Sequence, residues 1–233
     1  MFKKGRQIKQ ILGISVDSTS ISSVLSICEE FLISRGKFYV VTPNPEMMVL
    51  AQNDLEFKKA LNNADLAIPD GWGLRWGNPE IGQRVSGREV MLGLIDKTRS
   101  KDIKTLLVGG KPGIAQAAAF KLGVLGITDP DIELINKIQP QLLFVALGHG
   151  KQEKWIAKNL PKLKVKIAMG VGGALDQVAK PWLIAPKWMQ TFGLEWLWRL
   201  ILQPWRIKRQ FSLVKYVYLV LKEKMVKYRY AVK

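Results

Sequence analysis

The sequence predicts an α/β fold, in which a Rossmann-like, mostly parallel sheet is flanked by helices. Short runs rich in Val, Ile and Leu alternate with segments of helical periodicity, which is the pattern of repeated β-α-β units. The chain has 233 residues, of which 48% are hydrophobic and 24% are charged, and these values are typical of a folded globular protein. A chain of this length can form one such domain with a short appendage.

The individual elements follow from this pattern along the chain. Six apolar runs are predicted to be strands, at residues 11–16, 38–42, 66–69, 105–109, 142–147 and 166–171. Five segments with apolar residues at helical spacing are predicted to be helices, at residues 21–33, 55–62, 88–98, 113–122 and 152–160. Asp17 and the three hydroxyl residues that follow it offer several N-caps for the first helix.

The composition changes near Pro181. Five of the eight tryptophans lie between positions 182 and 205, and from Arg199 onward ten basic residues face one acidic residue, Glu223. Apolar residues recur there at intervals of three and four, which predicts an amphipathic helix: Val214, Val217, Tyr218, Leu221 and Met225. We therefore expect an α/β domain at residues 1–195 and a C-terminal basic amphipathic helical appendage at residues 196–233.

This basic segment has two interpretations. It can be a terminal helix packed on the domain with solvated lysines, or a surface that meets lipid or a lipid-linked molecule. The clustered indoles favour the second, because tryptophan prefers interfaces with one apolar and one wet side.

The charge balance narrows the class of partner. The chain carries 36 Lys and Arg against 19 Asp and Glu, a net charge of +17, which indicates an anionic partner such as nucleic acid, phospholipid or a phosphorylated substrate. The N-terminal 20 residues lack the apolar core of a signal peptide, and no uncharged apolar run approaches about 18 residues. The single cysteine, Cys28, cannot form an internal disulfide. We therefore expect a cytoplasmic location, and these features are also compatible with attachment to a membrane surface.

Loops that follow the predicted strands could carry chemistry, because open α/β sheets bind ligands at the carboxyl ends of their strands. In the loop at 42–46, Thr42 and Asn44 can present hydrogen-bonding groups, although Asn44 can instead cap a helix that starts near Pro45. In the loop at 67–73, Asp70 lies where a carboxylate could accept a proton from an attacking hydroxyl. The alternative is an Asp-Gly turn in which Asp70 caps the next helix.

A glycine-rich turn follows the predicted strand at 105–109. Its backbone N–H groups and one lysine could contact a phosphate: Gly109, Gly110, Lys111 and Gly113. The turn matches neither a Walker A loop nor a dinucleotide fingerprint.

Two later loops, at 148–155 and 170–174, bring glycines and polar side chains to the same edge of the sheet. His149 is the only histidine, and we expect it to be structural. No Cys/His cluster or acidic pair has the spacing of metal ligands, so no protein-bound metal is expected.

Taken together, these segments resemble the WecG/TagA/CpsF family of bacterial glycosyltransferases. The matching stretches occur in the family's order across nearly the whole chain: ILGISVD (11–17), VTPNPEMMVLAQND (41–54), ADLAIPDGWG (64–73), GGKPG (109–113), GKQEKWI (150–156), GVGGALD (170–176) and APKWMQTFGLEWLWRL (185–200).

The resemblance implies an inverting, metal-independent transfer of N-acetylmannosamine or a related sugar from a UDP donor. The acceptor would be undecaprenyl-diphosphate-linked N-acetylglucosamine, in the synthesis of teichoic acid linkage units or other surface glycans. No cofactor is implied, because the UDP-sugar is a co-substrate. The resemblance also implies a peripheral enzyme on the inner face of the cell membrane.

The resemblance further implies roles for individual residues. Asp70 falls on the general base, Thr42 and Asn44 lie close to the acceptor and catalytic pocket, and Gln152 lies near donor and catalytic groups. The C-terminal arginines of the family, suited to gripping phosphate oxygens, fall on Arg199, Arg206 and Arg209. Gly172 and Gly173 join the glycine-rich turn as candidate donor-binding residues.

The sequence departs from the family pattern in two places. The segment at 122–128 is shorter by about one strand and loop, so the edge of the sheet and part of the donor pocket need not follow the family. The small residue and proline that usually precede KQE are replaced by His149 and Gly150, so we expect a looser donor loop.

Two other functions are compatible with parts of the sequence. The charge and the Trp/Arg interleaving suit a basic nucleic-acid-binding α/β protein, but the charge is concentrated in one tail and no HTH, RRM, KH or zinc signature is present. We expect no nucleic-acid partner. The shortened segment at 122–128 would suit a catalytically altered family member that only binds a UDP-sugar.

The apolar residues of the C-terminal tail could also pack against a second subunit in a homo-oligomer.

Overall fold

The computed structural model describes residues 6–231, apart from the side chains of residues 208–209 and 227–231. Its centre is a six-stranded sheet in the order β4-β3-β8-β7-β5-β6, and every neighbouring pair is parallel. The strands are β3 (Phe38–Val41), β4 (Leu66–Ala67), β5 (Thr105–Gly109), β6 (Leu125–Ile127), β7 (Leu142–Ala146) and β8 (Ile167–Gly170). The predicted α/β class is confirmed.

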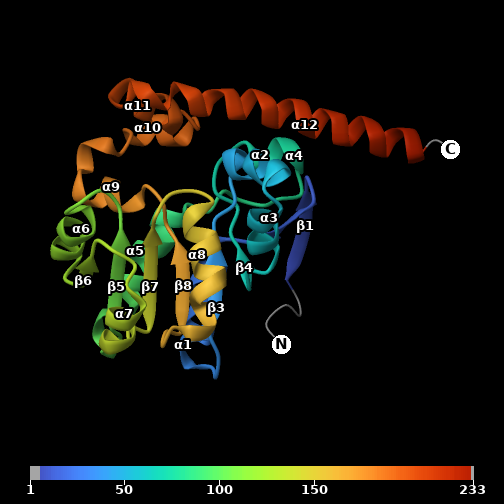
Figure 1. Cartoon of the computed structure of the whole chain (residues 1–233). Helices are drawn as coiled ribbons and strands as arrows, with labels where there is room; N and C mark the ends of the chain where they lie inside the picture. The colour runs from blue at the N-terminus through green and yellow to red at the C-terminus, as the bar shows by residue number, and fades with distance from the viewer. Residues whose placement is uncertain (1–5, 232–233) are drawn as a thin grey trace.

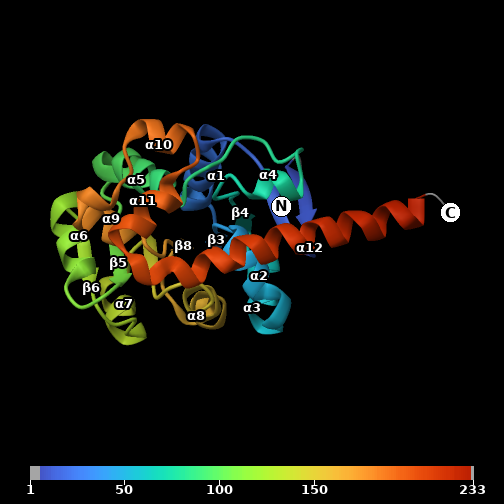
Figure 2. The ribbon, with the colours of Figure 1, turned by 90° about the horizontal axis from the view of Figure 1, so that it is seen from above.

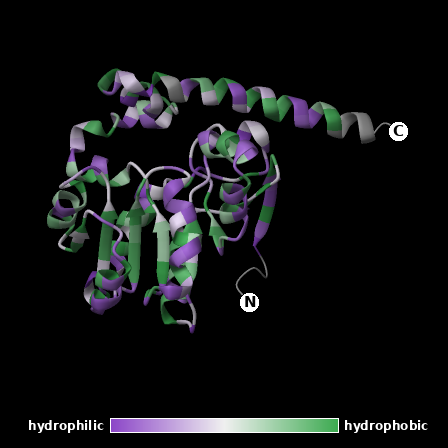
Figure 3. Cartoon of the chain, viewed as in Figure 1, coloured by the Kyte–Doolittle hydropathy of each residue, from purple (hydrophilic) through white to green (hydrophobic). Residues whose placement is uncertain are grey.

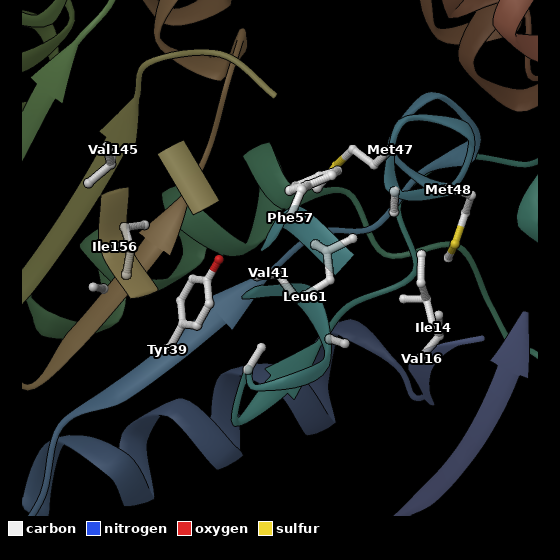
Figure 4. Packing of buried hydrophobic residues seen from close by; sticks show 14 of the residues in the cluster. Ile14, Val16, Tyr39, Val41, Met47, Met48, Phe57, Leu61, Val145 and Ile156 are labelled. Atoms are coloured by element: carbon white, nitrogen blue, oxygen red, sulfur yellow. The ribbon is translucent and has the colours of Figure 1, made fainter. Parts of the chain in front are cut away.

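Helices cover both faces of the sheet (Figures 1 and 2). Buried residues on one face pack against α1 (Ile21–Ile33), α5 (Gly87–Thr98), α6 (Ile114–Leu122) and α9 (Ala174–Ala179). Those on the other face pack against α2 (Pro45–Asn53), α3 (Leu55–Asn62), α7 (Ile132–Ile138) and α8 (Lys151–Asn159). Figure 4 shows the second cluster, where Phe57 and Leu61 of α3 lie beside Val41 of β3.

The first predicted strand, at 11–16, is wrong. The structure has a separate antiparallel hairpin there, β1 (Gln7–Ile11) and β2 (Ile14–Ser18). Leu12 and Gly13 form its two-residue turn with φ values of 50° and 73°, as tight hairpin turns require. Asp17 fastens the hairpin to the sheet by accepting a hydrogen bond from the Ala67 N–H at 2.8 Å. Ser20, among the predicted caps, is the N-cap of α1.

The shortened segment at 122–128 closes the edge of the sheet with a three-residue strand. This strand, β6, pairs in parallel with β5 from Leu106 to Val108. The helix that follows, α7, was not predicted. Its N-cap is Asp131, whose carboxylate accepts hydrogen bonds from the N–H groups of Glu133 and Leu134.

The C-terminal segment runs above the carboxyl edge of the sheet (Figure 1). It comprises α10 (Lys187–Thr191), α11 (Glu195–Leu202) and the 25-residue α12 (Ile207–Ala231). α12 packs on α2 and on the short α4 (Leu74–Gly77), and its end projects beyond the body of the molecule (Figures 1 and 2). None of the helices among the described residues is long and apolar enough to cross a membrane.

Candidate active site

The carboxyl edge of the sheet gathers most of the candidate residues. β4, β3, β8 and β7 are consecutive neighbours in the sheet, so the loops that leave their carboxyl ends meet along one edge. These loops carry Asp70, Thr42, Gly172 with Gly173, and His149. α10 and α11 lie above this edge (Figure 1).

Asp70 is half-buried just beyond β4, where its N–H donates to the Pro43 carbonyl at 2.9 Å. Burial raises the pKa of Asp70 from 3.8 to about 6, the charge of Glu195 adds to the rise, and Arg84 and His149 oppose it. The N–H of Gly87 also donates to this carboxylate. Gly87 is the first residue of α5, so Asp70 faces the start of that helix rather than capping α4. A carboxyl with this pKa is mostly ionised at neutral pH and is more basic than an ordinary aspartate.

Thr42 lies beside Gly87, whose N–H contacts the Asp70 carboxylate. It is buried, and a β-carbon built on Gly87 would lie 2.8 Å from Thr42 Cγ2 and 3.5 Å from its Oγ1. Any side chain at position 87, the first residue of α5, would therefore collide with Thr42.

Asn44 acts as the N-cap of α2, because its Oδ1 accepts a hydrogen bond from the Met47 N–H at 3.0 Å. The capping interpretation of Asn44 is confirmed, and this cap fixes where the loop that carries Thr42 ends.

Gln152 is buried and joins two loops. Its Oε1 accepts from the Gly172 N–H at 3.0 Å, and its Nε2 donates to Glu153 Oε1 at 2.7 Å. Glu153 in turn accepts from the Gly150 N–H at 2.7 Å, and burial raises its pKa. Gln152 thus holds the loop after β8 against the start of α8 and acts through Gly172.

His149 lies between the start of α2 and the loop after β8. Its Nδ1 lies 3.5 Å from Glu46 Oε2, and a β-carbon built on Gly172 would lie 3.4 Å from its Nε2. Its charge lowers the pKa values of both Asp70 and Glu153. The sequence placed His149 at this edge but gave it only a structural role, and the structure puts it among the charged groups that act on Asp70.

The C-terminal arginines differ in what they reach. The Arg199 guanidinium lies over Gly173, where a built β-carbon would be 2.9 Å from its Nη1. Arg206 donates from Nη1 to Gln203 Oε1 at 3.1 Å, beside it in the chain. The side chain of Arg209 lies outside the described residues.

The glycine-rich turn after β5 lies on the same edge of the sheet. The Gly110 N–H donates to the Ala146 carbonyl at 2.8 Å, and a β-carbon on Gly109 would lie 2.8 Å from that oxygen. Gly109, Gly110 and Gly113 all have positive φ, and the turn contacts the end of β7 through Gly109 and Gly110. Lys111 is exposed.

A sequence model of the glycosyl transferase WecG/TagA/CpsF family matches residues 9–125 and 127–230. The chain belongs to this family. A relative from Bacillus subtilis (strain 168), named N-acetylglucosaminyldiphosphoundecaprenol N-acetyl-beta-D-mannosaminyltransferase, is 29% identical over 93% of this chain and 92% of its own length. A relative of the same name from Staphylococcus aureus (strain MRSA252) is 26% identical over 92% of each chain.

This WecG/TagA/CpsF glycosyltransferase also has a charged pair at the site that sequence reasoning missed. Arg84 Nη1 lies 2.8 Å from Glu195 Oε1, and Nη2 donates to Oε2 at 2.9 Å. The two residues are far apart in the sequence, and the only signal was that Glu195 falls in the last matching stretch.

The electrostatic character of the site is mixed. Arg84 and His149 act on one basic carboxylate, Asp70, and Arg199 lies over Gly173 in the loop after β8. Among the described residues, no group of three or more His, Cys, Asp and Glu side chains is arranged to hold a metal ion. The arrangement can therefore accept a proton at Asp70 and bind negative charge through arginine.

Proposed function

We propose that the protein transfers N-acetylmannosamine, or a related sugar, from a UDP donor to undecaprenyl-diphosphate-linked N-acetylglucosamine. The observation that carries this proposal is the carboxylate of Asp70, with its raised pKa, at a sheet edge that also bears Arg84 and Arg199. The names of the two relatives state the same acceptor and the same transferred sugar.

Asp70 is the general base of the proposed reaction. Its carboxylate takes the proton from the attacking hydroxyl of the acceptor, whose oxygen forms a bond to the anomeric carbon of the donor. The bond from that carbon to the β-phosphate oxygen of UDP breaks, and UDP leaves with the electron pair. A single displacement of this kind inverts the anomeric centre. Thr42, which lies against Gly87, orients the acceptor in this proposal.

Cationic side chains and backbone N–H groups stabilise the leaving diphosphate in this proposal. Arg199 lies over Gly173, and Gln152 fixes the adjacent Gly172, so one face of this loop is positioned for a phosphate. Negative charge builds on UDP as the sugar bond breaks, and arginine can bind its oxygens through two parallel hydrogen bonds. Arg206, Arg209 and the turn at 109–113 contribute further groups, and no step requires a metal ion.

α12 supplies a membrane-facing surface in this proposal. An apolar stripe on the helix points outward: Phe211 is 71% exposed, Val214 71%, Tyr218 61%, Leu221 55% and Met225 62%. Its packed side instead carries Tyr216 and Val220, which are buried. The alternation of apolar and polar residues along this helix is visible in Figure 3.

The outward direction of this stripe favours the lipid interpretation over a helix packed by its apolar stripe. Lys215 and Lys222 are exposed beside the stripe, and each basic residue near an anionic membrane contributes about 1 kcal/mol of attraction. We therefore propose that residues 196–233 attach the α/β domain to the inner face of the cell membrane.

A donor screen tests the proposed reaction. Purified protein is incubated with UDP-N-acetylmannosamine, its uronic acid or other UDP-sugars, together with a short-chain polyprenyl-diphosphate N-acetylglucosamine. Mass spectrometry should detect the acceptor extended by one sugar, with inverted configuration by NMR. No product with any donor, although UDP binds, would favour a catalytically altered member. Tighter binding to RNA than to anionic vesicles, with steep salt dependence, would favour the nucleic-acid alternative.

A further inference from the structure

Glu195 connects the C-terminal segment to the loop that precedes α5. It is the first residue of α11, and both of its carboxylate oxygens face the Arg84 guanidinium, at 2.8 and 2.9 Å. The side chain of Arg84 is 18% exposed and that of Glu195 is 30% exposed. The Nη2–Oε2 contact is a hydrogen bond and the Nη1–Oε1 contact is a close ion-pair contact, and a pair with this little exposure is stronger than a solvated surface pair.

A second contact reinforces the connection two residues earlier. A β-carbon built on Gly193 would lie 2.9 Å from Trp72 Cδ1, so the ring of Trp72 packs directly on that glycine. Trp72 lies two residues after Asp70 in the loop after β4. The C-terminal segment therefore contacts the polypeptide that follows Asp70 at two points, Trp72 and Arg84.

The ion pair is close enough to Asp70 for both charges to act on it. Arg84 lowers the pKa of Asp70 and Glu195 raises it. Asp70 also feels His149 from the loop after β7 and the N–H of Gly87 at the start of α5. Of these groups, Glu195 is the acidic one, and its oxygens are engaged by Arg84.

We infer that Glu195 is a positioning residue of this site, which holds the Arg84 guanidinium in place beside Asp70 and offsets its positive charge there. This inference rests on the proposed function for the role of Asp70 as a base. Without the Glu195 carboxylate, the positive charge of Arg84 would stabilise ionised Asp70 and weaken it as a proton acceptor. The C-terminal segment would then contribute to the reaction through Glu195 as well as through Arg199.

The test is the Glu195→Gln variant, which keeps the shape of the side chain and removes its charge. A carbon-13 carboxyl NMR titration, with the Asp70 signal assigned by Asp70→Asn, should show a lower pKa for Asp70 than in the wild type. The acid limb of kcat/KM should move to lower pH in parallel, and kcat/KM at neutral pH should fall about tenfold. Glu195→Asp, which retains the charge, should restore most of the wild-type profile.

Two further variants control this test. Glu29→Gln removes a carboxylate that pairs with Lys97 and Lys101 away from the site, and it should change neither the titration nor the rate. Arg84→Gln should raise the pKa of Asp70. Its effect and that of Glu195→Gln should be non-additive in the double variant, because the residues act as a pair.

The possible outcomes separate the inference from the proposed function. An unmoved Asp70 titration in Glu195→Gln, or additive effects in the double variant, would show a merely structural tie and overturn the inference. If circular dichroism shows that Glu195→Gln does not fold, the Arg84→Gln variant takes its place. An Asp70 pKa that is the same in Arg84→Gln as in the wild type would then overturn the inference. A shifted titration with no sugar transfer by the wild-type protein would support the coupling and overturn the proposed function instead.

Discussion

Replacing Asp70 with asparagine is expected to stabilise the folded protein at neutral pH. Burial raises the pKa of Asp70 from 3.8 to about 6, so the folded state binds this proton more tightly than the unfolded chain does. Above pH 6 the ionised carboxylate therefore costs folding free energy. Asparagine has nearly the same shape, and its oxygen can still accept the hydrogen bond from Gly87, but it carries no charge.

The magnitude follows from the shift. Each pKa unit corresponds to about 1.4 kcal/mol, so a shift of about two units would cost roughly 3 kcal/mol for a carboxylate sealed from water. Asp70 is half-buried, and solvent screening reduces the expected gain for Asp70→Asn to roughly 1–2 kcal/mol at pH 7.5. Below pH 3.8 the wild-type carboxyl is protonated in both states, so the gain should disappear as pH falls from about 6 to below 4.

Urea unfolding followed by circular dichroism measures this difference at pH 7.5 and at pH 4. Asp54→Asn provides a control of opposite sign, because the hydrogen bond from Lys154 lowers the pKa of Asp54 and its loss should slightly destabilise the protein at pH 7.5. An Asp70→Asn variant that is less stable than the wild type at pH 7.5, or equally stabilised at both pH values, would refute the reasoning.

Two other predictions concern the C-terminal segment. Val214→Ser combined with Leu221→Ser should weaken co-sedimentation with anionic vesicles roughly 30–150-fold, because about 2–3 kcal/mol of apolar transfer is lost. The control Leu55→Ser, at an exposed position of α3, should leave co-sedimentation unchanged. If the Val214→Ser/Leu221→Ser variant pellets with vesicles as well as the wild type does, α12 is not the membrane-binding surface. Gly173→Ala should raise the KM for the UDP-sugar about tenfold, since the new methyl group displaces the Arg199 guanidinium. An unchanged KM would remove Arg199 from donor binding.

Much of the fold could be predicted because its signals are local. The helix at 21–33 and the strand at 105–109 have the predicted bounds, since their hydrophobic periodicity and flanking residues agree. The hairpin at 7–18 was missed because its turn, Leu12-Gly13, interrupts an apolar run by only two residues. A run of this kind reads as one continuous strand unless the positive φ of both residues is known.

The site could be predicted only where the sheet itself places a residue. Asp70 and Thr42 follow strands directly, so their common edge is implied by a parallel sheet. The pairing of Arg84 with Glu195 depends on how the C-terminal segment folds back, which no local pattern specifies. Likewise, the period of α12 was visible in the sequence, but the packing of Tyr216 and Val220 decides that the stripe through Val214 points outward.

The role of Asp70 as the proton acceptor is the central claim, and a single-turnover comparison tests it most directly. Wild type and Asp70→Asn are mixed with saturating UDP-N-acetylmannosamine and the lipid-linked acceptor, and the extended product is quantified over time. We predict that the transfer rate of Asp70→Asn falls about 10²–10⁴-fold, while its affinity for UDP stays close to that of the wild type. A transfer rate near that of the wild type would contradict the account.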